Sequence, residues 1–184
     1  MDKRTEDRKL KISEELEKKI NKLKTELSCL EYELKQREEP IRLLTAEEYE
    51  LYRNKIPNIG CAWWLQDRVG HMNEIEIVTP NGDRWWAYAN YKGCDPIGVR
   101  PVIDVTRLDI PLNQFKDYGQ ILHYCGITWF QINRTESWSR PTNLYIAEVP
   151  IGFRRFDGNS FSKDYDKSEI KEWLLKWYEE RKDI

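Results

Sequence analysis

The apolar residues of the first 40 positions recur at alternating steps of four and three. They are Leu16, Ile20, Leu23, Leu27, Leu30 and Leu34. This spacing keeps one apolar seam on a helix of about 3.5 residues per turn, which predicts a coiled coil that ends at Pro40. We expect residues 1–40 to be an oligomerisation helix that joins copies of the chain as a dimer or higher oligomer. Packing on the chain's own domain and pairing with a foreign helix are the alternatives.

Beyond Pro40 the pattern changes to short alternating runs separated by turn residues. Ile75 and Ile77 alternate with Glu74 and Glu76, which predicts a strand with one buried face. The Asn-Gly pair at 81–82 then predicts a hairpin, because both residues tolerate positive φ. The expected strands cover residues 61–66, 73–79, 84–89, 98–105, 121–124, 128–132, 144–148 and 152–156. Pro101 predicts a bulge or an edge within the fourth of these strands.

Two helices are expected in the same region. The first covers residues 41–52, where Thr45 and Glu48 have the spacing of a capping box. The second covers residues 167–181 and is capped by Ser168 or by Asp166. Its apolar positions 170, 173, 174 and 177 form one stripe, which predicts packing against a core. The sequence thus predicts an α+β domain over residues 41–184, with a C-terminal helix.

Composition limits the class of protein. The 184 residues carry a formal net charge of −2, and 12% of them are aromatic. An aromatic content this high is atypical of disordered chains. Apolar runs of the roughly 20 residues that cross a bilayer are absent. We therefore expect a cytoplasmic protein without a membrane partner.

The residue types offer little for catalysis. Nucleophile motifs, phosphate-binding loops and paired metal ligands are absent from the sequence, so we expect a protein that is not an enzyme and uses no cofactor. Its cysteines lack the close pairs typical of closed zinc sites. We therefore expect no metal site, although a set of Cys61, Cys94, Cys125 and His123 stays open. Reduced, partly buried thiols are the simpler interpretation.

Two adjacent tryptophan pairs, Trp63-Trp64 and Trp85-Trp86, fall on expected strands. Because successive side chains of a strand point to opposite faces, one member of each pair should be in the core, and the other should either pack under a loop or lie at the surface. Exposed Trp, Tyr and Arg are the residue types that anchor protein interfaces. The predicted partner-binding residues are Trp64, Asp67, Trp86, Tyr88, Tyr91, Trp138 and Arg140. Ordinary packing beneath long loops is the alternative.

A nucleic-acid surface is a second alternative. It would combine Arg154 and Arg155 with Arg134, Arg140 and the ring of Trp138. Three acidic residues at 157, 164 and 166 weaken the positive field there. Nucleic acid is therefore a possible partner but not the favoured one.

Residues 41–105 resemble a domain of unknown function that is common in Firmicutes and their phages. The family has a segment like LLTAEEYELY, a WWLRSP-type strand and a closing GVRPAL strand; here these are residues 43–52, 63–67 and 98–102. A strand like GITWFQI and a helix like YDKSEIKEWL normally come first in the family, but here they are residues 126–132 and 165–174. This order resembles a circular permutation.

The resemblance implies a C-type-lectin-like fold, with a mixed or antiparallel sheet, behind the N-terminal coiled coil. It also implies a non-enzymatic, oligomeric protein-binding module of phage or mobile-element origin, whose partner is a host or phage protein. Inhibition of a host defence protein, for example of the CRISPR type, is the role suggested by such genomes. Carbohydrate binding is a less favoured alternative, because the sugar-site motifs of true C-type lectins are absent. Gln66 and Asp67 replace the family's Arg-Ser, so the role of that arginine does not carry over.

Overall fold

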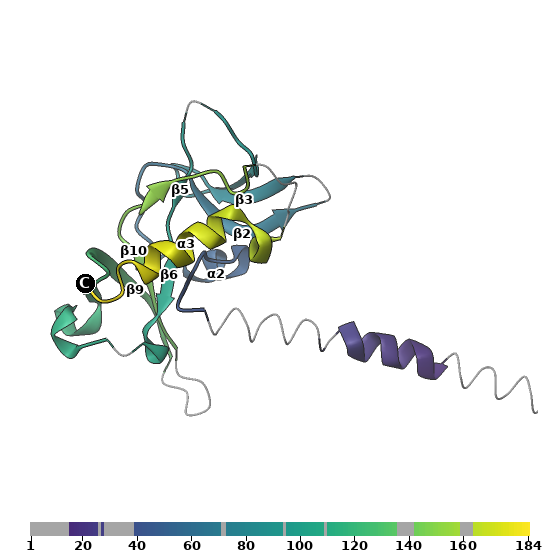
Figure 1. Cartoon of the computed structure of the whole chain (residues 1–184), viewed down its shortest axis with the longest axis horizontal. Helices are drawn as coiled ribbons and strands as arrows, with labels where there is room; N and C mark the ends of the chain where they lie inside the picture. The colour runs from purple at the N-terminus through teal and green to yellow at the C-terminus, as the bar shows by residue number, and fades with distance from the viewer. Residues whose placement is uncertain are drawn as a thin grey trace, which may run out of the picture. The chain divides into compact units, whose positions relative to one another are not determined.

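The computed structural model describes residues 15–25, 27, 39–70, 73–93, 95–108, 110–135, 142–158 and 164–184. The chain divides into two units, residues 1–39 and residues 40–184 (Figure 1). In the first unit residues 15–25 are helical, and Leu16, Ile20, Leu23 and Leu27 expose about half or more of their surface. Leu30 and Leu34 lie outside the described residues. The predicted coiled coil therefore stays a prediction.

The second unit contains a six-stranded sheet in the order β1-β6-β10-β9-β8-β7. All neighbouring strands in it are antiparallel. Its strands are β1 (Ile41–Arg42), β6 (Val102–Asp104), β7 (Phe115–Lys116), β8 (Ile121–Tyr124), β9 (Ile127–Thr135) and β10 (Thr142–Ala147). Residues 106–118, between two of the expected strands, contain β7 and most of three short 3-10 helices, η1 (Val105–Arg107), η2 (Leu112–Gln114) and η3 (Asp117–Gly119).

A five-stranded sheet has the order β11-β5-β2-β3-β4. Its strands are β2 (Trp63–Val69), β3 (Glu74–Val78), β4 (Arg84–Tyr88), β5 (Gly98–Val99) and β11 (Gly152–Phe153). Only β2 and β5 run parallel, and their ladder joins Trp63 to Gly98. The predicted hairpin between β3 and β4 is confirmed, with Thr79 N donating to Asp83 O at 2.8 Å and Gly82 at a φ of 85°.

Residues 98–105 do not form the single strand that was expected. Arg100 and Pro101 separate β5 from β6, so the chain leaves one sheet and enters the other at this point. The later half of the chain pairs with both pieces, β11 with β5 and β10 with β6. The two halves of the domain therefore share ladders in both sheets. The predicted α+β class is confirmed.

Arg100 is fully buried at this break. Its guanidinium donates to three backbone carbonyls, those of Ala147 at 2.9 Å, Pro57 at 2.9 Å and Glu148 at 3.3 Å. It also lies 5.4 Å from the ring centre of Trp63. Burial lowers the pKa of this guanidinium to about 10. Carbonyls and an aromatic face, rather than a carboxylate, thus accommodate the charge.

Helix α2 (Ala46–Tyr52) begins at the predicted capping box. Thr45 caps it, and the Glu48 carboxylate accepts a hydrogen bond of 3.0 Å from the Thr45 amide. The expectation that the helix starts at residue 41 is wrong, because Ile41 and Arg42 pair with β6. Glu48 also binds Arg42 through two hydrogen bonds of 2.6 and 2.7 Å. The cap thereby joins α2 to the six-stranded sheet.

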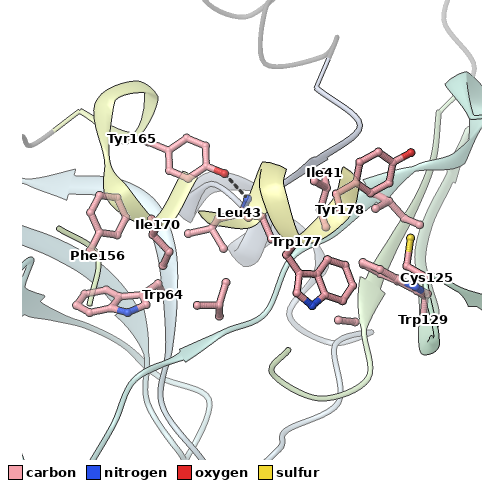
Figure 2. Close-up of a cluster of buried hydrophobic side chains, with 14 of the residues drawn as sticks. Ile41, Leu43, Trp64, Cys125, Trp129, Phe156, Tyr165, Ile170, Trp177 and Tyr178 are labelled. Carbon is pink, nitrogen blue, oxygen red and sulfur yellow. Dashed lines mark hydrogen bonds between the residues drawn. The ribbon is translucent and has the colours of Figure 1, made fainter. Parts of the chain in front are cut away.

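Helix α3 (Glu169–Glu179) follows a short 3-10 helix, η4 (Tyr165–Lys167), and is capped by Ser168. Its predicted apolar stripe faces a core cluster that includes residues of both sheets, as Figure 2 shows for Trp64 of β2 and Trp129 of β9. A second core cluster contains Tyr49 of α2 and Trp63 of β2. Strand β2 is therefore packed on both faces, with one cluster on each side.

Candidate binding surface

Strand β4 forms one edge of the five-stranded sheet. Within the described part of the chain it pairs only with β3, in a regular antiparallel register from Val78 and Arg84 to Glu74 and Tyr88. Short strands with charges, prolines or bulges are the usual protection of such edges against pairing with other chains. The one charged residue of β4, Arg84, is held by Glu76 of β3 through two hydrogen bonds of 2.6 and 2.7 Å. The rest of β4 is apolar or aromatic.

Three exposed aromatic rings lie on this edge. Trp85, Trp86 and Tyr88 have relative exposures of 62%, 37% and 49%, and we refer to them as the β4 aromatic cluster. The two indole rings are stacked, with centroids 6.3 Å apart and an interplanar angle of 13°. Trp86 also meets Tyr88 edge to face at 5.6 Å. The three rings therefore lie next to one another along β4, with Trp86 between Trp85 and Tyr88.

The backbone of β4 adds hydrogen-bonding groups to this surface. In an antiparallel ladder, residues alternate between pairs that exchange hydrogen bonds and pairs that do not. The bonds Thr79 N to Asp83 O and Ala89 N to Asn73 O, both 2.8 Å, place residues 83, 85, 87 and 89 in the bonded pairs. The amides of Arg84, Trp86 and Tyr88 therefore point away from β3, toward the open edge of the sheet.

Trp64, a predicted partner-binding residue, is not at the surface. It is fully buried in the core under α3, where its Nε1 donates to Arg154 O at 2.8 Å and its ring meets Phe156 at 5.6 Å (Figure 2). Its neighbour Trp63 is only 2% exposed, on the opposite face of β2. Both members of this pair are therefore packed inside the protein, as in the packing alternative. The expectation of one core member is wrong for Trp85 and Trp86, both of which are exposed.

Asp67 also has a structural position. Its carboxylate accepts a hydrogen bond of 2.5 Å from the amide of Ala46, at the start of α2. Burial, followed by the charges of Glu76 and Glu48, raises its pKa, although the bond from Ala46 acts in the opposite direction. The carboxylate thus stabilises an N-terminal helix turn inside the molecule, which corrects its assignment to the partner surface.

The other predicted residues have different outcomes. Trp86 and Tyr88 belong to the β4 aromatic cluster, whereas Tyr91 is exposed in the following loop and lines a separate pocket. Trp138 and Arg140 lie outside the described residues. Sequence reasoning missed Trp85, the most exposed ring of the cluster. The hairpin signal at Asn81-Gly82 was the available clue, because the second strand of a hairpin is often left at a sheet edge.

The described residues contain no group of three or more His, Cys, Asp or Glu side chains that could hold a metal ion. Burial raises the pKa of the Cys61 thiol, and it raises that of Cys125 to about 12. Because the thiolate is the reactive form, these two thiols are poor nucleophiles.

The described helices include none that is long and apolar enough to cross a membrane. Comparisons with known proteins add no assignment: family models, curated proteins and solved structures all lack a match to this chain. The arguments below therefore depend on the geometry of the chain itself.

Proposed function

We propose that this protein is a non-enzymatic, oligomeric protein-binding module that captures an extended segment of another protein along the edge of β4. The observation that carries this proposal is the β4 aromatic cluster on an edge strand whose outward amides face solvent. Both the backbone and the side chains of β4 are then available to one partner.

The chemistry of this edge favours a peptide over other ligands. An added strand would pair with the outward groups of Arg84 and Trp86, as in other complexes formed by strand addition. Trp85 and Trp86, on the two faces of β4, would then flank the added strand. Buried Trp and Tyr side chains supply most of the binding energy at many interfaces. Main-chain pairing would give affinity, and the rings would select apolar side chains of the partner.

Self-association would come from the other unit of the chain. Leu16, Ile20, Leu23 and Leu27 expose their side chains on one helix at coiled-coil spacing. Burial of such a seam against a second copy is the usual driving force of coiled coils. Two or more β4 edges in one oligomer would bind a multivalent partner more tightly than a single edge does. The resemblance to a phage domain makes bacterial host proteins, defence proteins first, the partners to test.

The test compares Trp86→Pro with Trp86→Ala in the full-length chain. Both variants remove the ring, but proline also removes the outward amide, without breaking a bond to β3. Proteins that the unchanged chain captures from a bacterial lysate are identified by quantitative mass spectrometry. The most enriched of them is then purified, and calorimetry measures its affinity for each variant. We expect Trp86→Ala to weaken its binding about 30-fold and Trp86→Pro to weaken it further.

The matched control is Leu112→Ala, which removes an exposed apolar side chain from η2, far from β4 in the sheet order. This variant should bind the partner as the unchanged chain does. Equal affinity of Trp86→Pro and the unchanged chain would reject edge pairing. Equal effects of the Pro and Ala substitutions would reject the backbone contribution.

A further inference from the structure

A pocket of about 570 Å³ lies apart from the β4 edge, between three segments of the domain. Its walls are the loop after β4, the residues after β11 and the first turn of α3. A volume of this size is typical of small-molecule sites. The proposed function makes no use of this pocket, so its role is a separate question.

The charges in this pocket are unbalanced. Lys92, Arg154 and Arg155 line it, and no carboxylate of the described residues forms an ion pair with any of the three. The one carboxylate among the lining residues is Glu169, whose Oε2 accepts a hydrogen bond from Gly158 N at 3.0 Å. Cations gathered in a cleft attract anions, and Arg and Lys are the usual partners of phosphate.

Aromatic rings accompany the cations on two walls. Tyr91 precedes Lys92, and Phe153 precedes Arg154; both rings are exposed and line the pocket. Gly93 permits the position of the first ring, because a Cβ there would overlap the Tyr91 phenol. Each of these two walls thus combines a flat apolar face with at least one positive charge. Nucleic-acid bases stack on such faces, and the phosphates of the same ligand bind the charges.

The walls are tied to each other and to the core by hydrogen bonds. Arg154 N donates to Ile97 O at 3.3 Å, and Asp157 N donates to Ala89 O at 3.0 Å. The carbonyl of Arg154 accepts from Trp64 in the core. The Arg154 guanidinium lies 5.1 Å from the ring centre of Trp173, and the Trp173 ring packs on Gly152 of β11. The pocket is therefore largely preformed, which reduces the entropic cost of binding.

We propose that this pocket binds a nucleoside phosphate, with the phosphates at Lys92 and Arg155 and the base against Tyr91 or Phe153. The ligand is either a free nucleotide or the phosphorylated end of a single strand. A second hollow of about 390 Å³ shares Arg154 and Trp173 with the pocket and adds Lys176, together with Arg181 and its ion-pair partner Glu180. The next nucleotide of a strand would occupy this hollow, whereas a free nucleotide would leave it empty.

The experiment uses the full-length protein and two fluorescently labelled probes, ATP and a 5′-phosphorylated ten-residue oligothymidylate. Fluorescence anisotropy measures the affinity for each probe at two salt concentrations. Saturable binding of either probe, weakened about 10-fold by Arg155→Glu and by Lys92→Glu, supports the proposal. Binding of ATP identifies a free nucleotide as the source, and binding of the oligonucleotide alone identifies a strand end.

The control variant is Lys116→Glu, which makes the same charge change on β7 of the other sheet. It should bind both probes as the unchanged chain does. The proposal is overturned if neither probe binds saturably, or if Lys116→Glu weakens binding as much as Arg155→Glu. Competition by heparin as strong as that by the unlabelled nucleotide would also overturn it. Trp86→Pro should bind the probes normally, so this test is independent of the β4 proposal.

Discussion

The two tryptophan pairs of this chain have opposite environments, although each lies on a strand of the same sheet. Trp63 and Trp64 are on β2, an interior strand, and both are buried. Trp85 and Trp86 are on β4, an edge strand, and both are exposed. Alternation along a strand gives each pair one residue per face. It does not say how many of those faces are covered.

The covering elements explain the difference. Tyr49 of α2 meets Trp63 edge to face at 5.6 Å, and the core under α3 encloses Trp64 on the other face. The cores under the two helices include Ala87 of β4 but neither of its tryptophans. A tryptophan pair is therefore buried where helices cover both faces of its strand, as on β2, and it stays exposed where that cover ends, as at Trp85 and Trp86 of β4.

The largest expected effect is that of Trp64→Ala. It removes the largest type of side chain from a fully buried position and leaves Arg154 O without its donor. We expect the free energy of unfolding to fall by about 3–5 kcal/mol. The same truncation at Trp85 should cost about 0.5 kcal/mol or less. Urea denaturation followed by circular dichroism measures both, and similar losses in the two variants would contradict the comparison.

A second comparison concerns the arginines near the two pairs. Arg100, which lies against Trp63, satisfies three carbonyls inside the protein, whereas Arg84 of β4 forms a half-exposed pair with Glu76. We expect Arg100→Met to lower the free energy of unfolding by about 3 kcal/mol, because buried acceptors lose their donors. Arg84→Met should cost about 1 kcal/mol or less. Equal melting temperatures of the two variants would show that the buried guanidinium is not required.

Local signals in the sequence were sufficient for several elements. Asn81-Gly82 predicted the hairpin, and Thr45 with Glu48 predicted the start of α2, because both features depend on residues close together in the chain. The stripe on α3 was equally clear from its spacing. Each of these predictions needed only backbone preferences or one helix face.

Features that depend on distant contacts were not predictable in this way. The burial of Trp64 requires Phe156 and the residues of α3, about 90 or more positions later in the chain. The role of Asp67 depends on the start of α2. The split of residues 98–105 requires two sheets whose order the sequence does not state. Two of the three rings of the β4 aromatic cluster, Trp86 and Tyr88, were therefore among the predicted residues, but Trp85 was not.

The smallest expected effect concerns helix α2, which covers Trp63 through Tyr49. It is measured as a change in stability with pH. Burial would raise the pKa of Glu48, but its bonds to Arg42 and Thr45 and the Arg42 charge lower it below the ordinary value of 4.5. A carboxylate with a lowered pKa stabilises the fold above about pH 4.5, and this stabilisation is lost as the pH falls through the value in the folded state.

We therefore expect Glu48→Gln to cost about 1–2 kcal/mol at pH 7 and less at acid pH, because the carboxylate of the unchanged chain takes up a proton as the pH falls through its lowered pKa. Glu47→Gln is the matched control, because Glu47 is the exposed neighbour on the same helix turn. It should leave the difference between the two pH values unchanged. Urea titrations at pH 7 and pH 3 measure this difference, and a constant gap between Glu48→Gln and the unchanged chain would show that the Glu48 carboxylate does not hold α2 over Trp63.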